Sequence, residues 1–426
     1  MSKRLLVAAL VLVMAIAAFA VPMTAAQEEV QLVWRTRPDN QAEIDVYTAA
    51  SQQIDEAWDG VSLTYSPGGQ EGAGYQDVLI AELEAGTAPD VFWIPGTDVA
   101  RFAELGLILN LHDLASADPE FNADDFYPGP MGFLTTPLEE GQEVLWGLPR
   151  DASAFAIYYN ADLFDEAGLD YPAAGWTWDD FFTAAEEITN LGEEVKGFGM
   201  NAWWANWGYW INAAGSRFFT EDYKACGLNN DATVVGLEAA RSLFANGWAV
   251  PWGEDSEPPF LAGNVGMFMN GRWATPGTIA NADFNWNVAP LPEGPGGPTN
   301  WLFWGAYVVN ANTAHPEEAW ELITRLTSAE IQGQIASLGA NIPSRANQEA
   351  IDLFLATLPD SGVNNQVFTD GLQVAVTEAP LFFGDWPAID AEYANQVNLV
   401  LNGELSAQEF ADTICDRVAP FFDSAQ

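Results

Sequence analysis

The chain has 426 residues, of which 49% are hydrophobic and 17% are charged. This composition excludes a disordered chain, and the length exceeds what one compact core usually holds, so we expect two lobes. The formal net charge is −46, because 60 acidic residues face 14 basic ones. Such a surface repels nucleic acids and anionic membranes, so we expect neither as a partner.

Residues 1–26 have the pattern of a secretory signal peptide. Lys3 and Arg4 give a basic start, residues 5–21 are apolar, and residues 24–26 supply a small-residue cleavage site. No cysteine follows the apolar stretch, so a lipid anchor is not predicted, although an uncleaved anchor remains an alternative. We expect an exported protein, in the periplasm or at the outer face of the cytoplasmic membrane.

The signal peptide holds two of the basic residues and no acidic ones, so the mature chain keeps 12 basic and 60 acidic residues, a formal charge of −48. A polycation would be attracted to this surface, but a well-solvated exported surface is the simpler explanation of the charge. The two cysteines of the sequence are Cys226 and Cys415. Export makes a disulfide between them plausible, and two buried free thiols are the alternative.

The first part of the chain alternates strands and helices. Apolar periodicity predicts strands at 31–34, 61–65 and 91–94, and helices at 43–57, 75–86 and 99–105. This alternation indicates an α/β lobe with a largely parallel sheet.

The segment 143–168 organises the middle of the chain. A corner at Pro149, Arg150 and Asp151 leads into residues 152–159, which are apolar on both faces and typical of a buried central strand. One interpretation is a surface turn that feeds a core strand. The alternative is a crossover, in which the chain leaves one lobe and starts another with polar groups facing the cleft.

The alternation resumes after this segment. Further strands are predicted at 197–200, 265–269, 285–291 and 302–310. Helices are predicted after the capping box of Thr177 and Asp180, at 231–245, 316–326 and 331–338, and after the capping box of Ser406 and Glu409. Residues 292–298, PEGPGGP, form the strongest linker signal of the sequence.

Five segments follow one another in a recognisable order: YQDVLIAELEAGTAPDVFWI, GLPRDASAFAIYYNADLFDEAGL with WTWDDF, GNVGMFMNGRW, FNWNVAPLPEGPGG, and VVNANTAHPEEAWELITRLTS. Together they resemble the motifs of family 1 extracellular solute-binding proteins, the sugar-capturing components of ABC importers. The maltose-binding protein is a distant relative in that group. The matches extend from about residue 30 to 345, and the tail resembles the family only weakly.

The resemblance implies a fold class: α/β, two-lobed, periplasmic-binding-protein-like (type II), with each lobe a doubly wound sheet flanked by helices. The ligand cleft would lie between the lobes, beyond the carboxyl ends of the strands. Crossovers would lie near Arg150, at 292–298 and at 339–345. The N-terminal lobe would then comprise 27–150 and 292–345, and the C-terminal lobe 151–291 and 346–426.

Sugars present weakly apolar faces that stack on aromatic rings, and the sequence holds 18 tryptophans. Trp273 aligns with the family's sugar-stacking tryptophan and is our first candidate. Trp204 and Trp207 follow, from the aromatic cluster at 203–210. Core packing is the alternative for each.

Three more tryptophans are candidates. Trp304 precedes Gly305, where many family members have two glycines, and a ring there would narrow the site. Trp93 ends a predicted strand, and Trp386 lies in the tail; core packing explains Trp93 equally well. Planar polar groups would bind the hydroxyls. The polar candidates follow strands, occupy the glycine-rich loop at 67–72 or lie at crossovers: Asp98, Arg35, Asp151, Arg345, Gln70 and Glu71.

No His/Cys cluster with metal spacing, no nucleophile elbow and no phosphate-binding loop is present, so we expect neither an enzyme nor a cofactor. A glycoside hydrolase needs two carboxylates at a set separation, and 60 acidic residues guarantee such pairs by chance. We therefore expect a monomeric binding protein that delivers a mono- or oligosaccharide to the permease subunits of an ABC importer. The alternative is a cationic solute such as a polyamine. Several carboxylates converging on the cleft would favour the cation, and one or two with arginines a neutral sugar.

Overall fold

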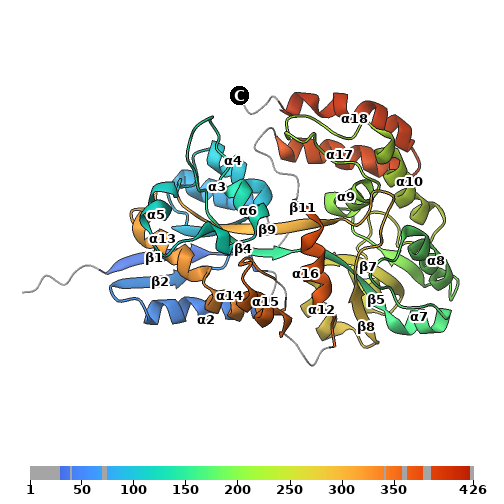
Figure 1. Cartoon of the computed structure of the whole chain (residues 1–426), viewed down its shortest axis with the longest axis horizontal. Coiled ribbons are helices and arrows are strands. Elements are labelled where there is room, and N and C mark those ends of the chain that lie inside the picture. The colour runs from blue at the N-terminus through green and yellow to red at the C-terminus, as the bar shows by residue number, and fades with distance from the viewer. Residues whose placement is uncertain are drawn as a thin grey trace, which may run out of the picture.

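The computed structural model describes residues 29–38, 41–69, 74–339, 342–356, 362–377 and 385–422. The predicted signal peptide lies outside these residues, as do Gln70 and Glu71. The described chain forms two α/β lobes that lie side by side, each built around its own β-sheet with helices packed against it (Figure 1).

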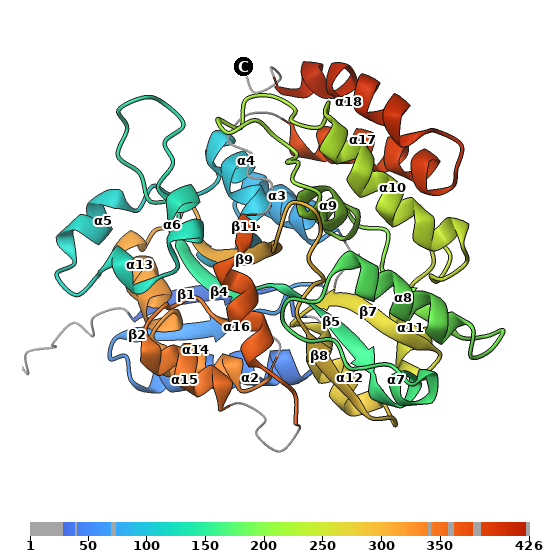
Figure 2. The same ribbon diagram turned by 45° about the vertical axis from the view of Figure 1, so that its right-hand side comes forward.

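The first lobe is built on the sheet β10-β4-β9-β3-β1-β2, with β11 beside β9. Its strands are β1 (Val30–Arg35), β2 (Val61–Tyr65), β3 (Val91–Pro95), β4 (Leu148–Ser153), β9 (Asn300–Val309), β10 (Ile342–Pro343) and β11 (Ala375–Thr377). Its helices are α2 (Gln41–Glu56), α3 (Tyr75–Ala85), the 3-10 turn η1 (Gly96–Asp98), α4 (Val99–Glu104), α5 (His112–Ala117), η2 (Ala123–Asp125), α6 (Pro128–Leu134), α13 (Pro316–Leu326) and α14 (Ala329–Ala336). In both ribbon views α3 and α4 lie on one side of this sheet and α2 and α14 on the other (Figures 1 and 2).

The second lobe is built on the sheet β6-β7-β5-β8. Its strands are β5 (Phe155–Asn160), β6 (Lys196–Gly199), β7 (Val265–Gly271) and β8 (Trp286–Ala289). Two apolar cores border this sheet. The helices of this part are α7 (Ala161–Ala167), α8 (Trp178–Thr189), α9 (Trp204–Ala213), α10 (Asp231–Ala245), α11 (Glu257–Leu261), α12 (Ala274–Asn281), α16 (Gln366–Gln373), α17 (Trp386–Leu401) and α18 (Ala407–Phe422). The helix α15 (Gln348–Leu355) packs on α14 and β10 of the first lobe.

Both sheets are mixed, so the expectation of a largely parallel sheet holds for the three strands of the first part of the chain and not for the sheet as a whole. In the first sheet β1 pairs in parallel with β2 and β3, but β9 runs antiparallel to both β3 and β4. Two consecutive strands of one sheet can pair in parallel only if a long crossover connection joins them. The strand β9 instead enters from the other lobe, so that constraint does not fix its direction.

The segment at 152–159 is not one central strand. It divides at Ala154 into β4, which pairs with β9 in the first sheet, and β5, which pairs with β7 and β8 in the second. The geometry therefore corresponds to the crossover interpretation rather than to a surface turn. The chain changes sheet again between β8 and β9, where the sequence PEGPGGP lies.

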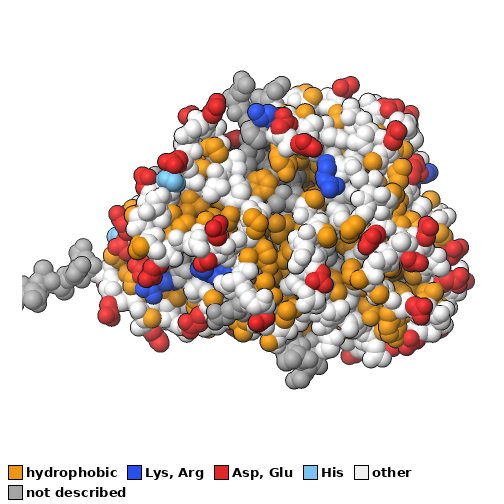
Figure 3. Space-filling view, in the orientation of Figure 1, with side chains coloured by type: hydrophobic (Ala, Val, Ile, Leu, Met, Phe, Trp, Pro, Cys, Tyr) orange, Lys and Arg blue, Asp and Glu red, His pale blue; other side chains and the backbone are white. Residues whose placement is uncertain are grey.

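The C-terminal helices α17 and α18 pack on α10 of the second lobe. A disulfide joins Cys226 to Cys415 of α18 and so fastens the last helix to the middle of the chain. Acidic side chains are spread over the face shown in Figure 3, with few basic ones between them. Among the described residues, none of the helices has the length and apolar character to cross a membrane.

Candidate functional site

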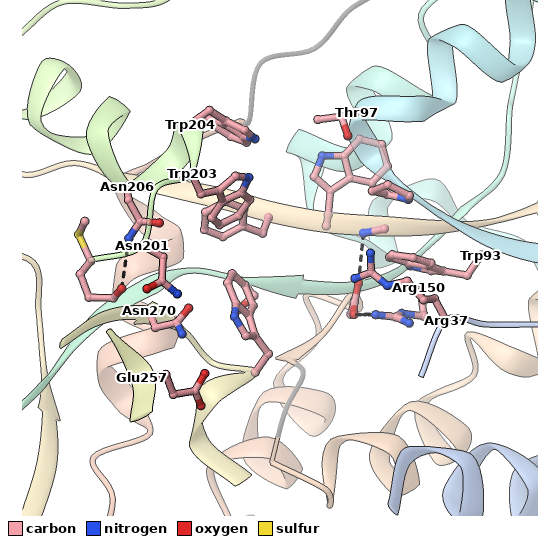
Figure 4. A pocket seen from close by; sticks show the side chains of 18 residues that line it. Arg37, Trp93, Thr97, Arg150, Asn201, Trp203, Trp204, Asn206, Glu257 and Asn270 are labelled. Atoms are coloured by element: carbon pink, nitrogen blue, oxygen red, sulfur yellow. Dashed lines mark hydrogen bonds and ion pairs between the residues drawn. The ribbon is translucent and has the colours of Figure 1, made fainter. Parts of the chain in front are cut away.

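A cavity of about 590 Å³ lies between the two lobes. The lining of the first lobe comes from the residues after β1, from β3 and η1, and from β4 and β9. The lining of the second lobe comes from the start of α9 and from α11, β7 and the start of α12. Figure 4 shows two groups of side chains that face each other across the cavity. The second lobe contributes Asn201, Asn206, Asn270 and Glu257, and the first lobe contributes Arg37, Trp93, Thr97 and Arg150. The lining residues are Arg37, Trp93, Pro95, Thr97, Arg150, Asp151, Ser153, Asn201, Trp203, Trp204, Asn206, Glu257, Met269, Asn270, Trp273, Phe303, Trp304 and Gly305.

Two guanidinium groups lie over Trp93 on the first lobe's wall. The Cζ atoms of Arg37 and Arg150 are 5.0 Å and 4.7 Å from the centroid of the indole ring, within the range of cation–π attraction. Arg150 also forms an ion pair with Asp151, whose Oδ1 accepts a hydrogen bond from the Gly305 backbone at 3.1 Å. Burial by itself would lower the pKa of Arg150, but the Asp151 carboxylate raises it above its ordinary value, so Arg150 stays charged.

Two glycines leave the space that the indoles of Trp93 and Trp304 occupy. A Cβ atom on Gly96 would overlap the indole of Trp304, and one on Gly305 would overlap the indole nitrogen of Trp93. The other side of Trp304 stacks on Phe133 of α6, with the ring centroids 6.3 Å apart and the planes at 17°. Both tryptophans are therefore held in fixed positions by close packing.

The second lobe contributes an aromatic wall. Trp273 and Trp203 pack against Phe303, with ring centroids 5.2 Å apart in each pair. Trp273 lies on Gly271, where any Cβ atom would overlap it. Trp204 joins the same group, its ring 5.3 Å from that of Trp203. Aromatic faces of this kind can stack on the apolar face of a sugar ring.

Three asparagines and one carboxylate supply the polar groups of the second wall. The side-chain oxygen of Asn201 accepts from the Ser256 backbone at 2.9 Å, and that of Asn270 accepts from the Gly271 backbone at 2.8 Å. These bonds fix the two amides, and their NH2 groups donate no hydrogen bond within the part of the chain that the structure describes. Together with Glu257, the wall offers both donors and acceptors to hydroxyl groups.

Five of the residues chosen from the sequence line this cavity: Trp93, Asp151, Trp204, Trp273 and Trp304. Trp207 does not, because it lies one helical turn beyond Trp204 and is buried against Phe218 and Tyr393. Trp386 also stays outside the lining. It contacts Trp204 edge-on, at a centroid distance of 5.8 Å, and supports that ring from behind.

The remaining polar candidates do not line the cavity. Arg35 pairs with Glu82 of α3, and Arg345 pairs with Asp125 at 3.0 Å. Asp98 ends η1, next to the lining residue Thr97, and burial raises its pKa. Gln70 and Glu71 lie outside the described residues.

Several lining residues were not predicted. Arg37 lies two positions after Arg35, the last residue of β1, and Arg150 was identified only as part of a corner. Asn201 and Asn206 stand out in the sequence as polar residues within an aromatic cluster, which is a usable signal. Glu257 gives no such signal, because it is one of 60 acidic residues.

Residues 42–333 match the family model of the bacterial extracellular solute-binding proteins. This match covers more than half of the chain. The chain belongs to this family. It is accordingly an extracellular solute-binding protein of the kind that serves ABC transporters, and the known members of this group that resemble it bind solutes rather than catalyse reactions.

A binding protein of Brucella abortus (strain 2308) is 28% identical over 314 residues, which are 66% of this chain and 71% of that protein. Two solved structures have the same two-lobed fold. The ABC substrate-binding protein Lmo0181 from Listeria monocytogenes, in complex with cycloalternan, gives a TM-score of 0.80 at 20% identity, covering 92% of this chain and 98% of that one. UgpB from Mycobacterium tuberculosis, in complex with glycerophosphocholine, gives 0.77 at 18% identity, covering 91% and 97%.

Proposed function

We propose that this solute-binding protein is exported and captures a mono- or oligosaccharide in the cavity between its lobes, then delivers it to an ABC permease. The observation that carries the proposal is the composition of the second wall. Aromatic faces of Trp203, Trp204 and Trp273 lie beside the fixed amides of Asn201 and Asn270. Sugars require this combination of stacking surfaces and planar hydrogen-bonding groups.

The charges of the lining do not favour a polyamine. Among the described residues the lining holds two carboxylates, Asp151 and Glu257, and two guanidinium groups, Arg37 and Arg150. Asp151 is already paired with Arg150. A cationic solute would need several unpaired carboxylates around it, so this lining supports a sugar better.

A thermal-shift screen of residues 27–426 tests the proposal. The ligands are sugars, polyamines, amino acids and glycerol phosphates, because a ligand that binds the folded state raises the melting temperature. We expect a rise with a sugar that disappears in Trp273→Ala. Trp252→Ala is the matched control, since Trp252 lies in the same lobe and does not line the cavity. A rise with a polyamine and none with any sugar would contradict the proposal.

A further inference from the structure

A short hairpin of the second lobe, residues 218–227 between α9 and α10, contacts the first lobe. Backbone hydrogen bonds close the hairpin, among them the bond from the Gly227 N–H to the Phe218 carbonyl at 2.8 Å. In Figure 2 the segment between α9 and α10 extends toward the helices of the first lobe. Near the tip of the hairpin, Tyr223 meets Phe133 of α6, with the ring centroids 6.2 Å apart and the planes at 76°. An edge-to-face aromatic contact therefore joins the two lobes.

The ring of Phe133 also supports the lining of the cavity. It stacks on Trp304, which lines the cavity, and Gly96 leaves the space for that indole. A row of three rings thus leads from the hairpin of the second lobe, through α6, to the wall of the first lobe. Close packing transmits displacements along such a row, so the contact between the lobes is coupled to the position of a lining residue.

The backbone of Tyr223 adopts an unfavourable conformation at this contact. Its φ is 56°, and among the residues that the structure describes no other residue except glycine has a positive φ. A bulky side chain rarely occupies the left-handed region, whereas glycine occupies it without strain. Strain of this kind persists where the surrounding structure holds it, and it concentrates at ligand clamps and switch regions. Since glycine would fit the backbone better, the aromatic ring is what this position supplies.

The base of the hairpin is fixed to the second lobe. Phe218 and Phe219 are 3% and 7% exposed and belong to the core of that lobe. They hold the hairpin in addition to the disulfide at Cys226. On the other side of the contact, Phe133 packs against the core of the first lobe. If the lobes separate by a hinge motion, each ring must follow its own lobe and the contact between Tyr223 and Phe133 must break.

We propose that Tyr223 is a latch residue, whose ring on Phe133 holds the lobes together around the cavity and slows the release of a bound ligand. Tyr223 is a positioning residue, because it does not line the cavity and acts through Phe133 on Trp304. One aromatic pair contributes modestly, so the latch shifts the balance between closer and more separated lobes without locking them. This inference rests on the proposed function, because it requires that a ligand is captured between the lobes.

Small-angle X-ray scattering of the ligand-free protein, residues 27–426, tests the latch without a known ligand. Tyr223→Gly removes the ring and accepts the positive φ without strain, so the variant should remain folded. We expect its radius of gyration and its largest dimension to exceed those of the wild type, because the lobes separate more often. Tyr223→Phe keeps the ring and should restore the wild-type profile.

Tyr171→Ala is the matched control for this experiment. Tyr171 is an exposed aromatic residue of the same lobe, and its ring packs on Tyr159 and Phe164 of that lobe. Its removal should leave the scattering profile unchanged.

Dissociation kinetics give a second readout, with maltose, glucose and galactose as probes and tryptophan fluorescence as the signal. For a probe that binds, Tyr223→Gly should raise the dissociation rate constant about three- to tenfold and leave the association rate constant within about twofold. In a Phe133→Ala background the same substitution should have no further effect, because the two rings act as a pair.

Equal scattering profiles for Tyr223→Gly and the wild type would overturn the latch. So would a dissociation rate constant that rises as much in Tyr171→Ala as in Tyr223→Gly. Failure of every sugar to bind would count against the proposed function alone, and the scattering profiles would still decide whether the latch exists.

Discussion

The side chain of Asn300 pairs with the backbone of Phe155 as a neighbouring strand would. Its Nδ2 donates to the Phe155 carbonyl at 2.8 Å, and its Oδ1 accepts from the Phe155 N–H at 2.9 Å. Asn300 begins β9 and Phe155 begins β5, so the pair joins two segments where the chain changes sheet. Gly371 of α16 permits the approach, because a Cβ there would lie 2.8 Å from Nδ2.

We expect Asn300→Ala to lower the free energy of unfolding by about 2–4 kcal/mol, since it leaves both buried backbone groups of Phe155 without partners. Urea denaturation measures the loss. Asn402→Ala, at the exposed end of α17, is the control and should change stability far less. An Asn300→Ala protein as stable as the wild type would show that the pairing contributes nothing.

The buried pair of Arg150 and Asp151 gives a second prediction. Their side chains are 10% and 12% exposed. Asp151→Asn leaves Arg150 buried and uncompensated, so we expect a loss of about 3–5 kcal/mol in the free energy of unfolding. The double variant Arg150→Met/Asp151→Asn should lose less, because it removes the uncompensated charge as well. Additive losses in this cycle would contradict the expectation.

Asp390 of α17 makes stability depend on pH. Burial raises the pKa of its carboxyl from 3.8 to about 6, so the folded state binds this proton more tightly than the unfolded state. Its favourable contribution is complete below about pH 4 and is lost as the pH rises through about 6. Asp390→Asn should therefore be more stable than the wild type by about 1–3 kcal/mol near pH 7 and equal to it near pH 4.

Chemical denaturation at the two pH values checks this. Asp412→Asn on the neighbouring helix α18 is the control, because Asp412 is exposed. If Asp390→Asn gains nothing at neutral pH, the carboxyl is better solvated than its burial indicates.

The disulfide gives a fourth prediction. Cys226 and Cys415 are 189 positions apart, and closing so long a loop restricts the unfolded chain strongly. The double variant Cys226→Ser/Cys415→Ser should lose about 2–4 kcal/mol of unfolding free energy. Ligand affinity should stay within about twofold of the wild type, because neither residue lines the cavity. A large loss of affinity would show that the bridge also positions the lobes.

Element positions followed closely from sequence periodicity. The strand at 61–65 and the helix at 231–245 have the predicted limits, and the capping box of Thr177 and Asp180 opens α8 as expected. These features depend on residues a few positions apart, which explains why a sequence reveals them.

The candidate site was predictable only in part. Trp204 and Trp207 share an aromatic cluster, but the start of α9 meets the cavity and the next turn meets the core. Arg35 and Arg37 differ in the same way: one turns to Glu82 and the other to the cavity. Residue type could not separate the members of these pairs, because the orientation of each element decides which side chain reaches the cleft.

The sequence by itself determined the elements, the family and the presence of aromatic and polar groups near the crossovers, because these are encoded in short stretches. Only the tertiary structure decided that β4 and β5 belong to different sheets, that β9 runs antiparallel to both its neighbours, and that Trp93, Arg150 and Trp304 share one wall. Each of these relationships depends on contacts with segments that are distant in the sequence. Packing between distant segments fixes them, and no local pattern records that packing.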